Sequence, residues 1–217
     1  MQDSTPQDVV KLSPSSFPYL HRCPCWERLP TPPNEAMKRG TAMDSLFREY
    51  LGSGRTTIDG IANNKLTSAE LKGVEWAGNS VRRACGSSTI ISDKKGCKFR
   101  FTIGGALISG EMDSYCPDKT LVFDLKSGAV RDYDAQMIPY SHYAMMDTNR
   151  TTALTCLVFC DKKMLRMKPF EMSYTEDWLN ELVDNVTNPN KKPMDGDMFA
   201  CTYCKFGGPD KKCKLKK

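Results

Sequence analysis

The sequence predicts an α/β domain in which a mixed central sheet is flanked by helices and the two ends form cysteine-bearing arms. Apolar residues recur at helical spacing in several segments, short apolar runs separated by turn residues fill the middle, and cysteines gather near both ends. A chain of 217 residues can bury one substantial core. We therefore expect one domain over residues 1–217, with arms at 13–30 and 195–217 and the sheet with its helix within 97–172.

Helix signals dominate the first third of the chain, after a polar start that is expected to be loose. Ser13 and Pro14 suit the beginning of a first helix, which the prolines at 30–33 end. Asn34 can cap a second helix. The apolar residues of this second helix fall at i, i+3, i+4 and i+7: Met43, Leu46, Phe47 and Tyr50. Thr67 and Glu70 predict the capping box of a third helix that reaches about residue 84.

Short strands are expected in the middle of the chain. Five apolar runs predict them: 98–103, 106–115, 120–126, 153–160 and 164–172. Gly104-Gly105 and Pro117-Asp118 supply hairpin turns between the first three runs. Helical patterns return over 134–146 and 175–186. This order of elements predicts a mixed sheet that is covered by helices.

Composition and charge exclude some classes of protein. The sequence has no run of 18 apolar residues, so we expect no membrane-spanning helix. Met1–Thr5 lacks a basic segment followed by an apolar one, so we expect no secretory signal and an intracellular protein. The formal net charge of +5 is compatible with a polyanionic partner but does not require one.

Cysteines fall into two groups. In a reducing compartment they act as metal ligands, reactive thiols or small core residues rather than as disulfides. Five of them lie in the middle of the chain beside apolar runs and are expected in the core: Cys85, Cys97, Cys116, Cys156 and Cys160. The other five lie near the ends: Cys23, Cys25, Cys201, Cys204 and Cys213.

The cysteines near the ends can supply a metal centre. Cys201-x-x-Cys204 with Cys213 provides three thiolates, and Cys23 can provide a fourth. Four thiolates suit a [4Fe–4S] cluster or a structural Zn²⁺ site. Cys25 could replace Cys23, and His21 is a weaker candidate ligand. The remaining alternative is that these five thiols are free in loose arms.

Asp113, Asp124 and Lys126 are the most informative polar residues of the predicted sheet. Asp113 falls in one strand and Asp124 in the next, so the tight turn between the strands can bring both carboxylates together. Asp124 and Lys126 are two residues apart and project from the same face of a strand. Two carboxylates are typical ligands of Mg²⁺, and an ammonium beside them can position water and stabilise developing negative charge. An ordinary hairpin with a solvated Asp–Lys pair would give the same tripeptide.

The residues around this tripeptide resemble the core motifs of the RecB-like PD-(D/E)XK nucleases. The motifs run in family order: Gly110-x-x-Asp113, then Asp124-x-Lys126-Ser127-Gly128, then Gln136 with Tyr140. Upstream, Arg39-Gly40-Thr41 with Asp44 resembles the family's Arg-Gly-Thr-x-x-His helix start. Asp44 stands where the family has a histidine metal ligand, and Asp is also an acceptable ligand for Mg²⁺ or Mn²⁺. The Ser13-x-Ser15 and Cys23-Pro24 opening extends the resemblance over residues 13–143.

The resemblance implies a restriction-endonuclease-like core that hydrolyses DNA phosphodiester bonds with Mg²⁺ or Mn²⁺. It implies exonuclease action on single-stranded DNA or DNA ends, in the cytoplasm of a prokaryotic cell or a phage-infected host. The implied metal ligands are Asp44, Asp113, Asp124 and the Leu125 carbonyl. Lys126, Gln136 and Tyr140 complete the implied catalytic set, so residues 97–172 would be the catalytic sheet and helix of a single nuclease domain. The alternative is a catalytically inactive DNA-binding module organised by a cysteine metal centre.

The cysteine pattern resembles the iron–sulfur subset of this family, which includes AddB-type and CRISPR-adaptation nucleases. In that subset, one N-terminal and three C-terminal cysteines hold a [4Fe–4S] cluster that joins the two ends of the chain. The resemblance implies that Cys23, Cys201, Cys204 and Cys213 do so here. The eight residues between Cys204 and Cys213 form a longer gap than the family pattern, which leaves structural Zn²⁺ open.

Overall fold

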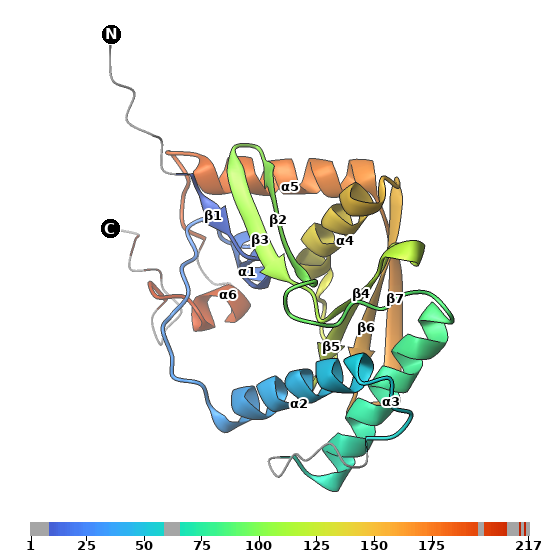
Figure 1. Cartoon of the computed structure of the whole chain (residues 1–217). Helices are drawn as coiled ribbons and strands as arrows, with labels where there is room; N and C mark the ends of the chain where they lie inside the picture. The colour runs from blue at the N-terminus through green and yellow to red at the C-terminus, as the bar shows by residue number, and fades with distance from the viewer. Residues whose placement is uncertain (1–8, 59–65, 195–197, 208–212, 214, 216–217) are drawn as a thin grey trace.

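The computed structural model describes residues 9–58, 66–194, 198–207, 213 and 215 (Figure 1). Its elements in chain order are β1 (Lys11–Leu12), the 3₁₀ helix η1 (Pro14–Ser16), α1 (Phe17–Leu20), α2 (Glu35–Gly52), α3 (Ser68–Cys85), β2 (Lys98–Ile103), β3 (Ala106–Glu111), β4 (Ser114–Cys116), η2 (Pro117–Lys119), β5 (Leu121–Lys126), α4 (Asp134–Thr148), β6 (Thr152–Phe159), β7 (Met164–Glu171), α5 (Met172–Thr187) and α6 (Met198–Thr202). The five expected helical segments are present, although the first, α1, ends at Leu20, well before the prolines that were expected to end it, and β1 and α6 are additional. None of the described helices combines the length and the apolar character needed to cross a membrane.

The described strands form two mixed sheets, whereas the sequence predicts one central sheet. The smaller sheet has the order β1-β3-β2 and the larger one the order β4-β5-β6-β7. Parallel pairing joins β1 to β3 and β5 to β6, and the other neighbours are antiparallel. The mixed α/β class is confirmed.

The division into two sheets comes from a break in the run that was expected to be one strand over 106–115. Met112 buries its side chain completely and donates its N–H to Cys97 O (3.0 Å), which ends the pairing with β2. The chain bends at Asp113 and then pairs with β5 as β4. Asp113 therefore lies between two strands, and its expected position within a strand is wrong.

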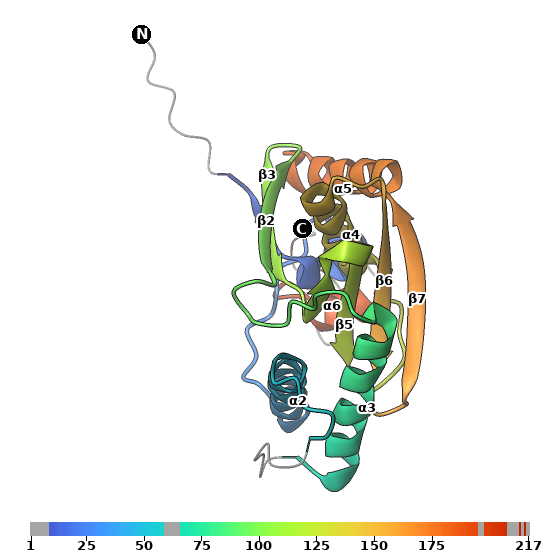
Figure 2. The ribbon, with the colours of Figure 1, turned by 45° about the vertical axis from the view of Figure 1, so that its right-hand side comes forward.

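Helices cover the larger sheet on both faces. In Figures 1 and 2, α4 and α5 lie at the top of the view and α2 and α3 at the bottom. Along β5, Val122 is buried in the core beneath α4 and α5, whereas Phe123 is buried in the core beneath α2 and α3. Because side chains alternate along a strand, Asp124 and Lys126 share the face of Val122. β5 therefore turns both residues toward α4.

Both predicted caps of the long N-terminal helices are present. Asn34 Oδ1 accepts from Met37 N (2.9 Å) at the start of α2. At the start of α3, Thr67 Oγ1 accepts from Glu70 N (3.3 Å), and the Glu70 carboxylate accepts from Thr67 N (2.7 Å). Hydrogen bonds from the backbone and side chain of Thr67, with a smaller contribution from Arg39, lower the pKa of Glu70 to about 2.

Replacing Glu70 with glutamine is expected to cost about 1 kcal/mol of unfolding free energy at pH 7, the usual contribution of a helix cap. Because the pKa of Glu70 is lower in the folded chain than its ordinary value of 4.5, its stabilisation is present above pH 4.5 and is lost as the pH falls toward 2. Urea unfolding at pH 7 and pH 3 should therefore show a smaller loss at pH 3. Glu181→Gln, at an exposed position inside α5, is the control. Equal losses for Glu70→Gln at both pH values would contradict the assignment.

The two cysteine-bearing arms pack against each other. Trp26 Nε1 donates to Ala200 O (3.1 Å), and Lys205 N donates to Glu27 O (2.8 Å). The ring of Tyr19 stacks on that of Phe199, with 4.8 Å between the ring centroids. Figure 1 shows α1 and α6, one from each arm, side by side. The expected meeting of the chain ends therefore occurs through side-chain packing and backbone hydrogen bonds.

The start of the chain is more ordered than its polar composition predicts. Lys11 and Leu12 pair with Leu107 and Ile108 of β3, and Leu12 is buried. The expectation of a loose segment is therefore wrong for these two residues, because one apolar side chain suffices to fix a short strand on a sheet edge.

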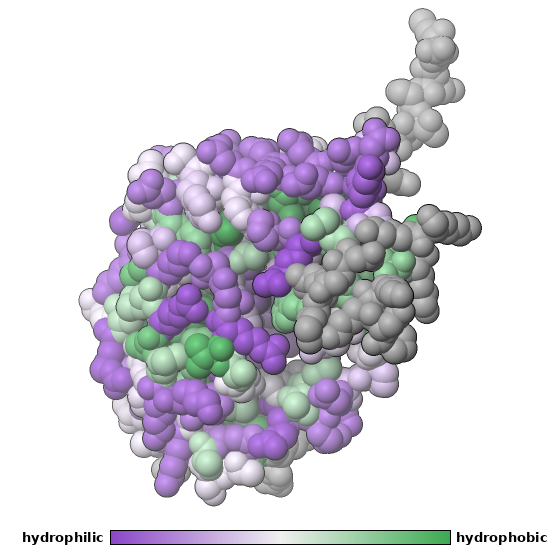
Figure 3. Space-filling model, turned by 180° about the vertical axis from the view of Figure 1, so that it is seen from behind, coloured by the Kyte–Doolittle hydropathy of each residue, from purple (hydrophilic) through white to green (hydrophobic). Residues whose placement is uncertain are grey.

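The cysteines predicted for the core are all buried: Cys85, Cys97, Cys116, Cys156 and Cys160. Hydrophilic residues cover most of the face seen from behind (Figure 3).

Candidate active site

The bend between β3 and β4 places the Asp113 carboxylate beside β5. Asp113 Oδ2 accepts a hydrogen bond from Leu125 N (2.6 Å), and Asp113 Oδ1 accepts one from Arg48 (2.9 Å). The N–H and C=O of a strand residue point to the same edge. The Leu125 carbonyl therefore faces the same edge of β5 as the Asp113 carboxylate.

Asp124 and Lys126 meet on the α4 side of β5. Lys126 Nζ lies 2.5 Å from Asp124 Oδ2, and the exposed fractions of these side chains are 14% and 4%. The ammonium also lies 4.4 Å from the centroid of the Tyr133 ring. The spacing of two residues along a strand thus produces the expected buried Asp–Lys pair.

Gln136 connects this pair to α4. Its Oε1 accepts from Lys126 Nζ (3.0 Å), and its Nε2 lies 3.4 Å from Asp124 Oδ1 and 3.3 Å from the Tyr140 hydroxyl. The structure therefore brings together Asp113, Asp124, Lys126, Gln136 and Tyr140. Tyr143, one helical turn further on, instead stacks on Phe99 of β2, with ring centroids 5.1 Å apart.

Arg48 is a pocket residue that the sequence analysis missed. It extends from α2, and its Nε donates to both oxygens of Asp44 (3.0 and 3.2 Å). Its other nitrogens contact the Met112 carbonyl (2.9 Å), Asp113 and, at 3.3 Å, Glu111. Asp44 therefore lies at the pocket, and both of its carboxylate oxygens contact the guanidinium of Arg48. The i, i+4 spacing of Asp44 and Arg48 was the only local signal that could have indicated this pair.

The electrostatics of the pocket favour a bound cation. Burial, followed by the nearby charges of Asp124 and Asp44, raises the pKa of Asp113 well above its usual range. Burial disfavours the charged form of Lys126. The charge and hydrogen bond of Asp124 favour that form, and the net result is a raised pKa of Lys126. Lys126 therefore stays protonated at neutral pH. Asp113 holds a proton more readily than an ordinary carboxyl unless a further positive charge enters.

The donor set fits a hard metal ion, although no ligand group is pre-assembled. Within the described residues, no three His, Cys, Asp or Glu side chains are already arranged to hold a metal. Asp124 Oδ2 is buried and paired with the Lys126 ammonium, 2.5 Å away. Such an oxygen beside a second carboxylate and a backbone carbonyl matches what Mg²⁺ and Mn²⁺ prefer.

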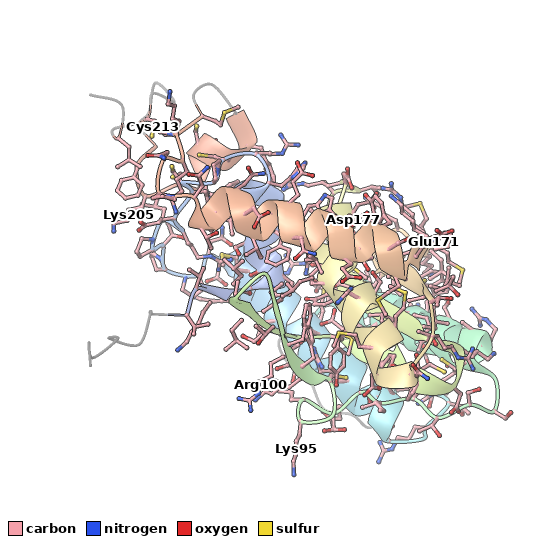
Figure 4. All side chains as sticks on the ribbon, turned by 90° about the horizontal axis from the view of Figure 1, so that it is seen from above. Lys95, Arg100, Glu171, Asp177, Lys205 and Cys213 are labelled. Carbon is pink, nitrogen blue, oxygen red and sulfur yellow. The ribbon has the colours of Figure 1, made fainter. Side chains whose placement is uncertain are left out.

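Two pockets adjoin this site on either side of α4. The larger, about 680 Å³, is the β2 groove, which we define by its lining residues: Lys98, Phe99, Arg100, Ser109, Gly110, Glu111 and Tyr143. Figure 4 shows Arg100 pointing outward from β2. The smaller pocket, about 310 Å³, is lined by residues that include His21, Arg22 and Arg131. Basic side chains therefore line both pockets, and the β2 groove also includes Glu111, which contacts Arg48.

The cysteines of the two arms gather in one region. The pKa of the Cys25 thiol is raised by burial and then by its neighbours Cys23, Cys213 and Cys204. Gly207 N donates to Cys204 O (3.0 Å), and Gly207 forms an isolated antiparallel β-bridge with Cys213. These contacts hold Cys213 near Cys204. Figure 4 shows Cys213 at this end of the molecule. The described ring contact of His21 is with Trp178, at 5.2 Å between centroids.

Comparison with known proteins gives no sequence relative. No family model matches the chain, and no curated protein matches it significantly. Among solved structures, a protein named SSO0001 has a TM-score of 0.41 and 16% identity, covering 96% of this chain and 91% of that one. A provisionally assigned exonuclease from Eubacterium rectale has a TM-score of 0.49 and 17% identity, covering 83% and 82%. A phage-related exonuclease from Haemophilus somnus 129PT has a TM-score of 0.32 and 14% identity, covering 82% and 97%.

With identities and TM-scores this low, these likenesses carry no functional argument. The interpretation of the site rests on its own geometry and chemistry.

Proposed function

We propose that this protein is a Mg²⁺- or Mn²⁺-dependent deoxyribonuclease of the RecB-like PD-(D/E)XK type, with a restriction-endonuclease-like core in a single domain. One observation carries the proposal. Asp113, Asp124 and Lys126 converge in one largely buried pocket, where the Lys126 ammonium lies 2.5 Å from Asp124 Oδ2 and Asp113 is held beside β5 by Leu125 N. A buried carboxylate pair beside a permanently charged ammonium is the donor set that phosphodiester hydrolysis needs.

In this proposal, Asp113 and Asp124 hold the metal ion, with the Leu125 carbonyl and Asp44 as further ligands. When bound, the ion supplies Lewis-acid chemistry, because it polarises the phosphodiester and acidifies water. The hydrogen bond from Leu125 N fixes Asp113 before any ion arrives. Pre-positioned ligands lower the cost of assembling the site.

Lys126 acts as a hydrogen-bond donor and not as a base, because its raised pKa keeps it protonated at neutral pH. Its ammonium would orient the attacking water and stabilise the negative charge that develops on the phosphoryl oxygens. Gln136 holds this ammonium and touches Asp124 with its other end. Tyr140 anchors Gln136 in turn, so both α4 residues are assigned to positioning the lysine.

The proposed substrate is DNA, as a single strand or a duplex end, and the proposed mode is exonucleolytic. The β2 groove combines Lys98 and Arg100 with the ring of Tyr143 and reaches the pocket at Glu111. Basic side chains alternating with an aromatic ring are typical of surfaces that follow a single strand, because cations contact phosphates and rings stack on bases. Arg22 and Arg131 offer a second basic border on the other side of α4.

We also propose that the arms hold a [4Fe–4S] cluster through Cys23, Cys201, Cys204 and Cys213, with structural Zn²⁺ as the alternative. The closeness of Cys25 to Cys23, Cys204 and Cys213 supports a shared centre in this region. It also makes Cys25 a competitor of Cys23 for the fourth position. Thiolates held this near one another repel, and a bound metal relieves the repulsion.

The proposed function is tested with anaerobically purified protein and end-labelled DNA, both single-stranded and blunt duplex. Mg²⁺ or Mn²⁺ should support progressive shortening of the labelled strand, and EDTA should stop it. Ca²⁺ should support binding with little or no cleavage, because it tolerates a looser coordination geometry. Tight DNA binding without cleavage in the presence of any of these ions would overturn the nuclease proposal. It would support the alternative, a catalytically inactive DNA-binding module.

A further inference from the structure

Arg48 is more enclosed than Lys126, and the proposed reaction gives it no role. Its side chain is 7% exposed, against 14% for Lys126. It contacts Asp44 from its own helix and Glu111 and Asp113 from the end of β3 and the bend that follows. An arginine cannot lose its proton in a protein, so this charge is permanent.

The charges of the pocket define how much further positive charge it accepts. Four carboxylates face it: Asp44, Glu111, Asp113 and Asp124. Arg48 contacts the first three and Lys126 the fourth. With four negative and two positive groups among these described residues, the ionised pocket has a net charge of −2, which one divalent cation neutralises.

The contacts of Arg48 are those that a second metal ion would make in a two-metal site. In such sites two ions share carboxylates and lie about 3.5–4 Å apart. The guanidinium bridges Asp113 to Asp44 and Glu111, while Asp124 pairs with Lys126 instead. Its planar fork suits this task better than an ammonium would, because several oxygens approach it in fixed directions.

We propose that Arg48 is a positioning residue that stands in place of a second metal ion, so that the pocket binds one divalent cation, between Asp113 and Asp124. This inference rests on the proposed function only in assuming that the pocket binds a metal. The guanidinium sets the orientation of Asp113 and balances the charge of Asp44 and Glu111. The charge of the pocket therefore matches one divalent ion.

The test counts bound Mn²⁺ per chain in the absence of DNA, by isothermal titration calorimetry and by electron paramagnetic resonance of the free ion. The wild-type chain should bind one Mn²⁺. Arg48→Gln removes the charge and leaves space beside an amide oxygen, so it should bind two. Arg48→Lys keeps the charge but loses the fork, so it should still bind one, with affinity reduced on the order of 10-fold.

Arg82→Gln is the matched control. Arg82 is also a partly buried arginine, and it donates to the carbonyl of Tyr50 and lies over the Tyr50 ring at 4.4 Å, away from the carboxylates. Its replacement should change stability without changing the number of bound ions. Thermal unfolding gives a second measurement: Mn²⁺ should raise the melting temperature of Arg48→Gln more than that of the wild type, because the ion restores the missing charge.

Two bound Mn²⁺ in the wild type, or one in Arg48→Gln at wild-type affinity, would overturn the inference, and so would no binding at all. If Arg48→Gln does not fold, the wild-type count and the affinity of Arg48→Lys still decide it. The outcome is independent of cleavage. A chain that binds one Mn²⁺ but cuts no DNA would end the proposed function and leave this inference standing, whereas a chain that cuts DNA with two ions would do the reverse.

Discussion

Replacing Lys126 with methionine is expected to lower the single-turnover rate of DNA cleavage on the order of 10³-fold, the usual loss when one donor to a developing negative charge is removed. Methionine keeps the buried stem and removes the ammonium that contacts Asp124 and Gln136. Lys126→Arg should lose a similar factor, because a planar fork does not fit the place of a compact ammonium. DNA binding should change much less than the rate, since the lost contact is made mainly in the transition state.

Lys168→Ala is the matched control for this loss. Lys168 also pairs with a carboxylate, Asp134, and lies 5.2 Å from an aromatic ring centroid, that of Phe170, but it sits on β7 outside the pocket. Its replacement should leave the rate within a few fold of the wild type. Each variant is first compared with the wild type by near-ultraviolet circular dichroism. A folded Lys126→Met protein that cleaves at the wild-type rate would remove Lys126 from the catalytic set.

Local rules predicted much of the pocket because two of its contacts are local. Asp124 and Lys126 share a face through the period of two in a strand, and Gln136 and Tyr140 meet through helical i, i+4 spacing. Tyr143 lies a further turn along the same helix, but its ring stacks on Phe99 from another element. Periodicity thus predicts which residues share a face, whereas the partner across that face comes from tertiary packing.

Residues whose role depends on distant segments were the ones missed. In the sequence, Arg48 occupies an ordinary polar position of an amphipathic helix. Its burial depends on the bend at Met112–Asp113, which brings three hydrogen-bond acceptors to α2. The local turn signals there are weak, since Gly110 and Asp113 stand apart within a run that was expected to form one strand. β1 was missed for a related reason: two residues carry too little pattern, and their pairing with β3 is set by the sheet that they join.

The arms show the same division between local pattern and tertiary contact. Cysteine spacing indicated that the two ends meet, but it could not indicate that the stacking of Tyr19 on Phe199 and hydrogen bonds to backbone carbonyls also join them. Nor could it rank Cys23 against Cys25, because Cys25 interacts with Cys204 and Cys213 as well as with Cys23 once the chain folds.

Replacing Cys204 with serine is expected to remove the metal from the arms and to lower the melting temperature on the order of 10 °C. A centre shared by Cys23 and the C-terminal cysteines closes a loop of nearly the whole chain, and its binding free energy adds to the free energy of unfolding. A loss of several kcal/mol corresponds to roughly this shift for a chain of about 200 residues. The shift should stay moderate in size, because the arms keep the Tyr19–Phe199 stack and the Trp26–Ala200 hydrogen bond.

Metal analysis and thermal unfolding of anaerobically purified protein check this expectation. The parent should be brown, with about four irons per chain if the cluster is present. Cys156→Ala, in the buried core between β6 and the α2–α3 pair, is the control that should keep the metal. Comparing Cys23→Ser with Cys25→Ser identifies the fourth ligand, since only the ligand's variant should lose the metal. One zinc per chain would assign the same arms to a zinc site. A metal-free parent, with Cys204→Ser melting at the parent's temperature, would leave the arms held by packing alone.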